Sequence, residues 1–484
     1  MGLDPGLRRL ALGTLLAAYP GSVPPEWAVD LVADGLAGHT LFGGNVIEPT
    51  QVSASTAMLR AGRSDVLVAI DEEGGDVTRL AHATGSPYPG NAALGAVGDV
   101  TLTRQVYQAI GTELAGVGIT LDLAPTVDVN TADDNPIIGT RSFGADPEQV
   151  AAHAAAATAG LQVAGVAACA KHFPGHGATV ADSHHELPTV DVAPELLRRR
   201  DLPPFAAVVA AGTKAVMTAH IRVPALTGTL PATFSRTVLV DLLRHEYGFD
   251  GVVVTDALEM KGAALAAGGI APGAVRALAA GADLLCIGAK VDADLVERVA
   301  TEIVAALGDG RLDRSRVEQA AGRVADLAAW TRTADRTTAA SGDLGYAAAR
   351  RALRVEGAPT GLDRSLVVQL HGNSTIAEGR VPWGLGPHLG GGAEQIRVVA
   401  AETDPADLRR RAAGRPILLV ARHLHRLPGG PELVDALSAT HPVAVVEMGW
   451  PATWRPDHVR AFVTTYGASH ANGRAAAEAL GLTH

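Results

Sequence analysis

The chain has 484 residues, which is long enough for two domains, although a single (β/α)8 barrel can take up roughly 250 of them. It carries 40 lysines and arginines against 51 aspartates and glutamates, a formal charge of −11. This excess of negative charge argues against nucleic-acid and membrane partners and favours a small ligand. The sequence carries no signal for an oligomeric state.

The N-terminal stretch LRRLALGTLLAAYPGS resembles a weak secretory signal, but its arginines fall inside the apolar run. We therefore interpret it as the first element of the fold. The two cysteines, Cys169 and Cys286, lie in the apolar runs VAACAK and ADLLCIG. Single thiols in such runs are typical of buried positions in a reducing compartment, so we expect no disulfide and a cytoplasmic protein.

Eight short apolar runs alternate with longer segments of helical length over the first 290 residues or so. Because their apolarity is continuous rather than alternating, both faces of each strand should be covered, as in a parallel sheet with crossover helices. Eight such units predict a (β/α)8 barrel within residues 1–330. The runs are LALGTLLA (10–17), HTLFG (39–43), VLVAI (66–70), ITLDLA (119–124), VAACA (166–170), AVMTA (215–219), GVVVT (251–255) and ADLLCIG (282–288).

Polar residues follow five of these runs, where a barrel enzyme carries its active groups. They are Asp71, Glu72 and Glu73 after the third run, Asp122 and Asp128 around the end of the fourth, Lys171 and His172 after the fifth, His220 after the sixth and Asp256 after the seventh. Solvation alone does not account for this distribution.

The segment KHFPGHGATVADSHHELP (171–188) contains four histidines in a loop hinged by Gly and Pro. A metal site is one interpretation, but the spacing is not that of a helical zinc-binding pair. A solvated polar loop is a second. A third is acid/base chemistry: Asp182 and His184 are two residues apart, so in an extended loop they share a face, and the carboxylate can hold a proton-transferring imidazole.

Asp256, in GVVVTDALEM, has two interpretations of its own. Capping of the next helix would explain an aspartate after a strand. The same place in a barrel enzyme suits a carboxylate nucleophile, and the nearby Asp182 and His184 motif favours that role. Lys171 and His172 are interpreted as ligand-binding groups, because a charged lysine that leaves a buried strand needs a partner.

A polar, small-residue segment at 331–345 predicts a linker to a second domain at 346–484. A helix-like YAAARRALR is followed by five strand-like runs, which predict a smaller α/β sandwich. These runs are SLVVQL (365–370), IRVVAA (396–401), PILLVA (416–421), PVAVVEM (442–448) and AFVTTYG (461–467).

Taken together, six motifs resemble glycoside hydrolase family 3, in its β-N-acetylhexosaminidase branch. They are DEEGGDVTR, DLAPTVDVN, RSFG, KHFPGHG with DSHHELP, VMTAHI and VVTDALEM. The resemblance implies a barrel and an α/β sandwich, with Asp256 as nucleophile, His184 as general acid/base and Asp182 as the residue that orients it. It further implies contacts to N-acetylglucosamine from Asp71, Arg79, Arg141, Lys171, His172, His220 and Met217. The chain departs from many relatives at Asp76, where they carry arginine.

The resemblance implies a retaining exo-β-N-acetylglucosaminidase that needs no cofactor or metal and acts on muropeptide or chitin-derived sugars. A neutral imidazole base does not repel an anion, so a phosphorylase that uses inorganic phosphate as acceptor is an alternative. A β-glucosidase or β-xylosidase with its acid at Glu432 or Glu447 is another. A non-catalytic amino-sugar-binding protein is a third, and a metal-dependent hydrolase a fourth.

Overall fold

The computed structural model describes residues 4–184, 186–288, 291–339, 342–372, 374–391 and 393–483. The chain divides into two compact units. The barrel unit comprises Met1–Glu72, Val100–Ile138 and Gly144–Ala340, and the second unit comprises Glu73–Asp99, Gly139–Phe143 and Ser341–His484. Two loops of the N-terminal half, 73–99 and 139–143, thus group with the C-terminal part of the chain, so the units are not separated at one point of the sequence.

The barrel unit is built on eight parallel strands in the order β7-β6-β5-β4-β3-β2-β1-β8. The sheet closes where the backbone N–H of Thr255 donates to the carbonyl of Leu284 at 2.9 Å. The (β/α)8 barrel predicted from the sequence is confirmed. Its strands are β1 (Leu15–Ala17), β2 (Gly38–Leu41), β3 (Leu67–Ile70), β4 (Leu121–Asp122), β5 (Ala167–Phe173), β6 (Ala215–Thr218), β7 (Val252–Thr255) and β8 (Leu285–Ile287).

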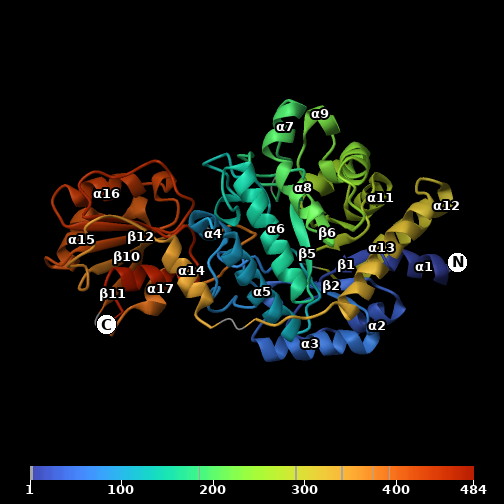
Figure 1. Cartoon of the computed structure of the whole chain (residues 1–484), viewed down its shortest axis with the longest axis horizontal. Coiled ribbons are helices and arrows are strands. Elements are labelled where there is room, and N and C mark those ends of the chain that lie inside the picture. The colour runs from blue at the N-terminus through green and yellow to red at the C-terminus, as the bar shows by residue number, and fades with distance from the viewer. Residues whose placement is uncertain are drawn as a thin grey trace. The chain divides into compact units, whose positions relative to one another are not determined.

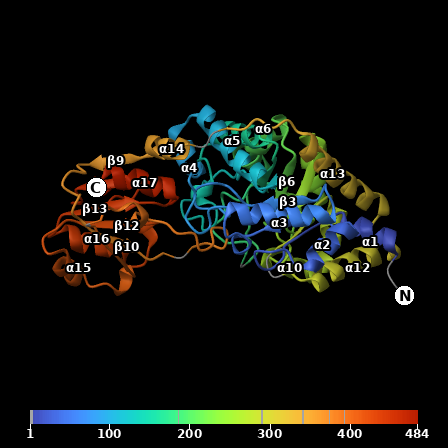
Figure 2. The same cartoon turned by 90° about the horizontal axis from the view of Figure 1, so that it is seen from below.

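Helices flank these strands in both views (Figures 1 and 2). They are α1 (Pro5–Leu12), α2 (Glu26–Asp34), α3 (Pro49–Gly62), α5 (Val100–Gly116), α6 (Pro147–Val163), α7 (Pro194–Arg200), α8 (Pro203–Ala210), α9 (Pro224–Thr227), α10 (Lys261–Ala267), α11 (Ile270–Ala280), α12 (Ala293–Asp309) and α13 (Arg314–Thr333), with a π-helix at Thr237–Glu246. The run at 10–17 was predicted as one strand, but its first three residues end α1, and Gly13 caps that helix.

The interior of the barrel is filled by inward-facing side chains from alternate strand positions, many of them alanine. Small side chains suit this place because eight strands leave little room inside. Cys169 and Cys286 belong to this cluster and are free and buried. No single described helix is long and apolar enough to span a membrane; α10 and α11 pass that test only as a pair, bent by 88°.

The second unit contains a six-stranded sheet in the order β11-β10-β12-β13-β14-β9, in which only β9 is antiparallel. Its strands are β9 (Arg354–Gly357), β10 (Leu366–Leu370), β11 (Glu394–Val398), β12 (Ile417–Ala421), β13 (Val443–Glu447) and β14 (Ala461–Thr464). Its helices are α4 (Asn91–Val97), α14 (Leu344–Ala352), α15 (Pro405–Ala412), α16 (Gly430–Ser438) and α17 (His470–Ala479).

This sheet is covered on both faces, as the predicted α/β sandwich requires. Side chains of α15 and α16 pack on one face and those of α17 on the other, and Figure 1 shows the strands between these helices. The sequence did not predict β9, whose four residues are all exposed at the sheet edge and therefore show no apolar run. The linker predicted at 331–345 is helical at both ends, in α13 and α14.

A buried carboxylate, Asp283, ties the last strand of the barrel to two helical segments. It is 0% exposed and pairs with Arg244, Arg316 and Arg323. It also accepts a hydrogen bond from the backbone N–H of Val253 at 3.0 Å. Burial lowers the pKa of Arg244 to about 10, which leaves it charged at neutral pH. Because Asp283 precedes β8, this cluster lies at the N-terminal end of the strands. Residues at that end of a barrel contribute to stability, whereas catalytic residues lie at the opposite end.

We expect Asp283→Ala to lower the free energy of unfolding by about 3 kcal/mol, because the remaining arginines keep their buried charge without a counterion. Urea denaturation of the full chain measures this change. Asp309→Ala is the matched control, since Asp309 pairs with Arg311 at the exposed surface and its loss should leave the midpoint unchanged. Equal denaturation midpoints for the two variants would contradict the stabilising role of Asp283.

Candidate active site

The ends of four strands, β3, β5, β6 and β7, bring polar residues to one mouth of the barrel. Asp71 follows β3, Lys171 lies near the end of β5, His220 follows β6 and Asp256 follows β7. All these strands are parallel, so their carboxyl ends share one edge. The strand topology therefore places these residues at the carboxyl ends of the strands, as predicted.

Lys171 and Asp71 form a buried ion pair at this mouth. Lys171 Nζ lies 2.6 Å from Asp71 Oδ1, and the lysine side chain is only 2% exposed. Behind the pair, the Asp122 carboxylate accepts a hydrogen bond from the backbone N–H of Glu72 at 2.9 Å and so holds the turn that follows Asp71. Burial raises the pKa of Asp122 well above its usual range.

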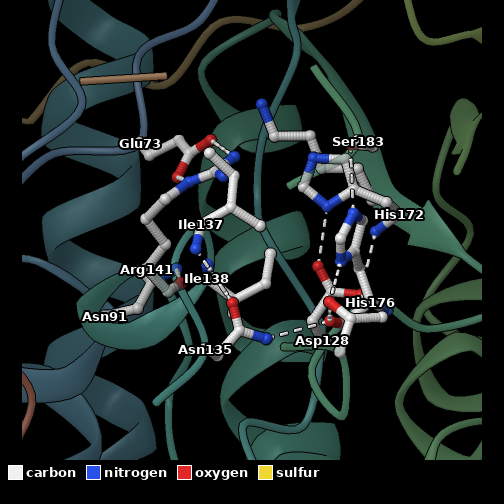
Figure 3. A network of polar contacts seen from close by, with 12 residues as sticks. Glu73, Asn91, Asp128, Asn135, Ile137, Ile138, Arg141, His172, His176 and Ser183 are labelled. Atoms are coloured by element: carbon white, nitrogen blue, oxygen red, sulfur yellow. Dashed lines mark hydrogen bonds and ion pairs between the residues drawn. The ribbon is translucent and has the colours of Figure 1, made fainter. Parts of the chain in front are cut away.

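His172 is oriented by a fully buried carboxylate, Asp128 (Figure 3). The His172 Nδ1–H donates to Asp128 Oδ2 at 2.7 Å, and the backbone N–H groups of His172 and His176 donate to Oδ1 at 3.3 and 2.6 Å. Burial opposes the charge on Asp128, but the neighbouring His172 outweighs it and lowers the pKa of this carboxyl. One ionised side chain thus determines the ring orientation of His172 and the path of the backbone beyond it.

The loop that follows β5 is anchored by His176. Its ring nitrogens hydrogen-bond the hydroxyl groups of Thr179, at 2.7 Å, and of Ser183, at 3.1 Å, as Figure 3 shows for Ser183. The Ser183 carbonyl in turn accepts a hydrogen bond from the backbone N–H of Gly262, in the first turn of α10. Gly177 fits against the backbone of Val129 so closely that a Cβ atom there would overlap its carbonyl oxygen.

Asp182 and His184 form the pair that their spacing predicted. The His184 Nδ1–H donates to Asp182 Oδ1 at 2.7 Å, and the His184 backbone N–H donates to the same oxygen at 2.9 Å. Both side chains are about one-fifth exposed. The carboxylate therefore sets the tautomer and leaves Nε2 as the nitrogen available for proton exchange with a ligand.

Asp256 lies after β7 and outside the helix that follows it. Helix α10 begins at Lys261 after an N-cap at Met260, so Asp256 does not cap it. Its Oδ1 accepts a hydrogen bond from the backbone N–H of Ala257 at 2.8 Å. Burial raises the pKa of the Asp256 carboxyl, but His220, His172 and His184 outweigh this and lower it overall. Asp256 is therefore ionised at neutral pH. The loop that carries His184 reaches the segment after Asp256, because the Ser183 carbonyl accepts a hydrogen bond from the backbone N–H of Gly262.

His220 and Met217, which the resemblance implies as sugar contacts, both contact other parts of the barrel. The Nε2–H of His220 donates to the carbonyl of Ala257 at 3.0 Å, and Thr233 Oγ1 donates to Nδ1 at 2.8 Å. Through these contacts, His220 holds the backbone next to Asp256. Burial lowers its pKa and keeps the ring neutral. Met217 is 3% exposed and packs in the barrel interior.

Arg141 and Arg79 belong to the second unit. Arg141 is buried, and its Nε and one terminal nitrogen donate to the two carboxylate oxygens of Glu73 at 2.9 and 2.8 Å (Figure 3). This bidentate pair fixes the guanidinium plane. Arg79 is also buried and donates to the carbonyl of Ala377 at 2.7 Å. Glu73, in the acidic DEEGG turn, thus orients Arg141.

Asp76 is a structural acceptor in the second unit. It accepts hydrogen bonds from the Thr140 hydroxyl at 2.6 Å and from the Ala468 backbone N–H at 2.7 Å. Arg422 lies 3.7 Å from it and also pairs with Glu378. Burial lowers the pKa of Arg422, but Glu378 and Asp76 outweigh this and raise it, so the guanidinium stays charged.

The two glutamates considered as alternative acids differ in their surroundings. Glu447 is buried at the end of β13, and its oxygens accept hydrogen bonds from the backbone N–H groups of His423, Leu424 and Gly449. Burial raises its pKa. These contacts organise two loops, which is a structural role. Glu432 is exposed in the first turn of α16.

Sequence reasoning assigned no role to Asp128 or His176. Asp128 was noticed only as a polar residue near a strand end, and His176 only as one of four histidines. Their roles depend on hydrogen bonds that appear when the loop folds back on β5 and α10. His185, the fourth histidine, lies outside the described residues. Among the described residues, no three histidine, cysteine, aspartate or glutamate side chains are arranged to hold a metal ion.

The anchoring histidine predicts a pH effect on stability. Burial lowers the pKa of His176 from 6.5 to about 4, so protonation favours the unfolded state, and stability is lost as the pH falls from 6.5 towards 4. We expect His176→Phe, which cannot titrate, to remove about 2 kcal/mol of the decline in unfolding free energy between pH 7 and pH 5. Urea denaturation at both pH values measures it.

His245→Gln is the control, because His245 lies on the exposed side of the π-helix. This variant should keep the pH dependence of the wild type. If His176→Phe showed the same decline as the wild type, the buried, neutral state of His176 would be refuted.

The comparisons with known proteins agree on the family. Residues 22–327 match the family model described as the glycosyl hydrolase family 3 N terminal domain. Beta-hexosaminidase A of Pseudoalteromonas piscicida is 34% identical over 332 residues, which cover 63% of this chain and 55% of that protein. Beta-hexosaminidase of Chromobacterium violaceum is 40% identical over 257 residues, 52% of this chain and 71% of that protein. The chain thus spans little more than half of the Pseudoalteromonas protein.

A solved structure resembles both units. The glycoside hydrolase family 3 beta-N-acetylglucosaminidase from Paenibacillus sp. superposes with a TM-score of 0.88 at 32% identity, over 98% of this chain and 96% of that one. Family membership, which the motifs implied, is therefore confirmed. The chain belongs to glycosyl hydrolase family 3 and is an enzyme of that family.

Proposed function

We propose that the protein is a retaining exo-β-N-acetylhexosaminidase that releases terminal N-acetylglucosamine. The observation that carries the proposal is the Asp182–His184 pair at the same barrel mouth as the ionised Asp256. Relatives named beta-hexosaminidase and beta-N-acetylglucosaminidase support the choice of sugar. Small muropeptide or chitin-derived saccharides in the cytoplasm are the substrates we infer.

In the first step, Asp256 attacks the anomeric carbon while Nε2 of the protonated His184 gives its proton to the departing oxygen. The glycosidic bond breaks as the bond to the Asp256 oxygen forms, through an oxocarbenium-like transition state. Asp182 stabilises the protonated imidazole before the transfer and keeps its ring in place afterwards. The low pKa of Asp256 keeps its carboxylate ready for attack.

In the second step, the neutral His184 takes a proton from water, and the resulting hydroxide displaces Asp256 from the anomeric carbon with net retention. Asp71, Lys171 and His172 bind the hydroxyl groups of the sugar at the mouth of the barrel. Their mutual pairing and the Asp128 contact hold them in place before the substrate arrives, which lowers the entropy cost of binding.

The nucleophile is tested by Asp256→Ala. We expect it to lower kcat for a nitrophenyl N-acetyl-β-glucosaminide by about 10³-fold or more, because no other group forms the covalent intermediate. Asp250→Ala, at an exposed residue just before β7, is the control and should retain wild-type kcat. A variant of Asp256 with more than a tenth of wild-type kcat would refute the role.

The acid/base pair is tested by His184→Ala with two leaving groups. With a poor leaving group we expect kcat/KM to fall by about 10²- to 10⁴-fold, since protonation of the leaving oxygen is lost. With a dinitrophenyl leaving group, which needs no protonation, kcat/KM should stay near wild type while kcat falls, because deglycosylation still lacks its base.

Azide, a nucleophile that needs no base, should restore kcat of this variant and yield the β-glycosyl azide. Loss of kcat/KM to the same extent for both leaving groups would contradict the acid role. Product analysis of the wild type in phosphate and in phosphate-free buffer identifies the acceptor: free sugar in both supports hydrolysis, and sugar 1-phosphate contradicts it.

A further inference from the structure

The second unit contains a pocket that the proposed chemistry does not use. Its volume is about 840 Å³, which lies in the range of pockets that hold small molecules. All of its lining residues belong to the sheet of this unit or to the loop after β10. The polar and aromatic ones are Gln369, His371, Ser374, Arg380, Trp383 and Arg397.

The pocket lies where an open α/β sheet binds ligands. Strand β10 is the first parallel strand of the sheet, β11 is added on one side of it and β12 on the other. The direction of chain progress across the sheet therefore reverses at β10. Ligands of such sheets bind outside the carboxyl ends of the strands at this reversal point. Gln369 and Leu370 end β10, and both line the pocket.

Two arginines give the pocket its charge. Arg397 lies beside Gln369 in the parallel register of β10 and β11, so both side chains point to the same face of the sheet. Arg380 approaches from the loop after β10. Among the described residues, neither guanidinium makes a hydrogen bond or an ion pair, and both side chains are exposed. No described carboxylate lines the pocket, so its charge is positive although the whole chain is acidic.

The remaining lining groups suit a saccharide. The indole of Trp383 lines the pocket, and it also lines a smaller neighbouring cavity that contains Arg422. The Arg422 guanidinium lies 5.6 Å from the centre of that ring and holds it in place. The Gln369 amide is fixed by Gln395, which donates to its Oε1 at 2.8 Å. An aromatic ring packs against the apolar face of a sugar, and amide and imidazole groups hydrogen-bond its hydroxyls.

We propose that this pocket binds a saccharide that carries a carboxylate, with Arg380 and Arg397 pairing with the acid and Trp383 contacting the sugar ring. Guanidinium groups bind carboxylates through two parallel hydrogen bonds, which gives both affinity and orientation. The site is independent of the barrel residues that carry the proposed hydrolysis. It gives the enzyme a second carbohydrate contact on its other unit.

The test uses the full chain and isothermal titration with three probes: N-acetylmuramic acid, which is N-acetylglucosamine with a lactyl carboxylate, N-acetylglucosamine itself, and inorganic phosphate. We expect the acidic sugar to bind at least tenfold more tightly than either of the other probes. Arg380→Ala and Arg397→Ala should each weaken its binding about tenfold or more, the effect of removing one charged hydrogen-bonding partner.

Arg364→Ala is the matched control, because Arg364 is exposed at the opposite end of β10. It should bind the acidic sugar like the wild type. Hydrolysis of the nitrophenyl substrate, measured on all variants, should be unchanged, which shows that they are folded and separates this site from the barrel. Equal binding of the neutral and acidic sugars, tighter binding of phosphate, or unchanged affinity in both arginine variants would each overturn the proposal.

Discussion

The buried charge of Asp128 is the constraint on which the candidate site of the barrel depends. One carboxylate, fully removed from water, accepts hydrogen bonds from the ring and backbone of His172 and from the backbone of His176. A buried carboxylate raises the free energy of the folded state unless its oxygens accept hydrogen bonds. The backbone after β5 therefore has little freedom to move away from Asp128. His176 extends the constraint to Ser183, which lies between Asp182 and His184 in the sequence. The loop that carries His184 is thereby tied to the buried carboxylate through a chain of hydrogen bonds.

The sequence predicted the barrel well because each strand is buried on both faces and is read as an uninterrupted apolar run. It also located Asp71, Lys171 and Asp256, since parallel strands bring their carboxyl ends together whatever the helices between them do. It did not predict the protein contacts of His220 and Met217, because a strand position alone does not tell which neighbours a side chain meets. Asp128 and His176 were missed for a related reason: most of their partners are backbone groups and hydroxyls, which carry no pattern in the sequence.

The second unit was predicted less completely. Its five parallel strands are apolar and were found, but β9 is an exposed edge strand without an apolar run. The grouping of residues 73–99 and 139–143 with this unit could not be read from the sequence either. It arises from side chains such as Asp76, whose carboxylate contacts Thr140 and Ala468, residues distant in the chain. Asp76 also contributes to the charge on Arg422, which in turn holds Trp383.

The loop after β5 combines a crowded root with an open tip. At the root, Gly177 has no room for even one added carbon atom, whereas Val180 at the tip is 67% exposed. A side chain added at Gly177 would displace the backbone of Val129, whereas a different side chain at Val180 would extend into solvent. The surface of this loop can therefore be altered at its tip while the backbone path at its root stays the same.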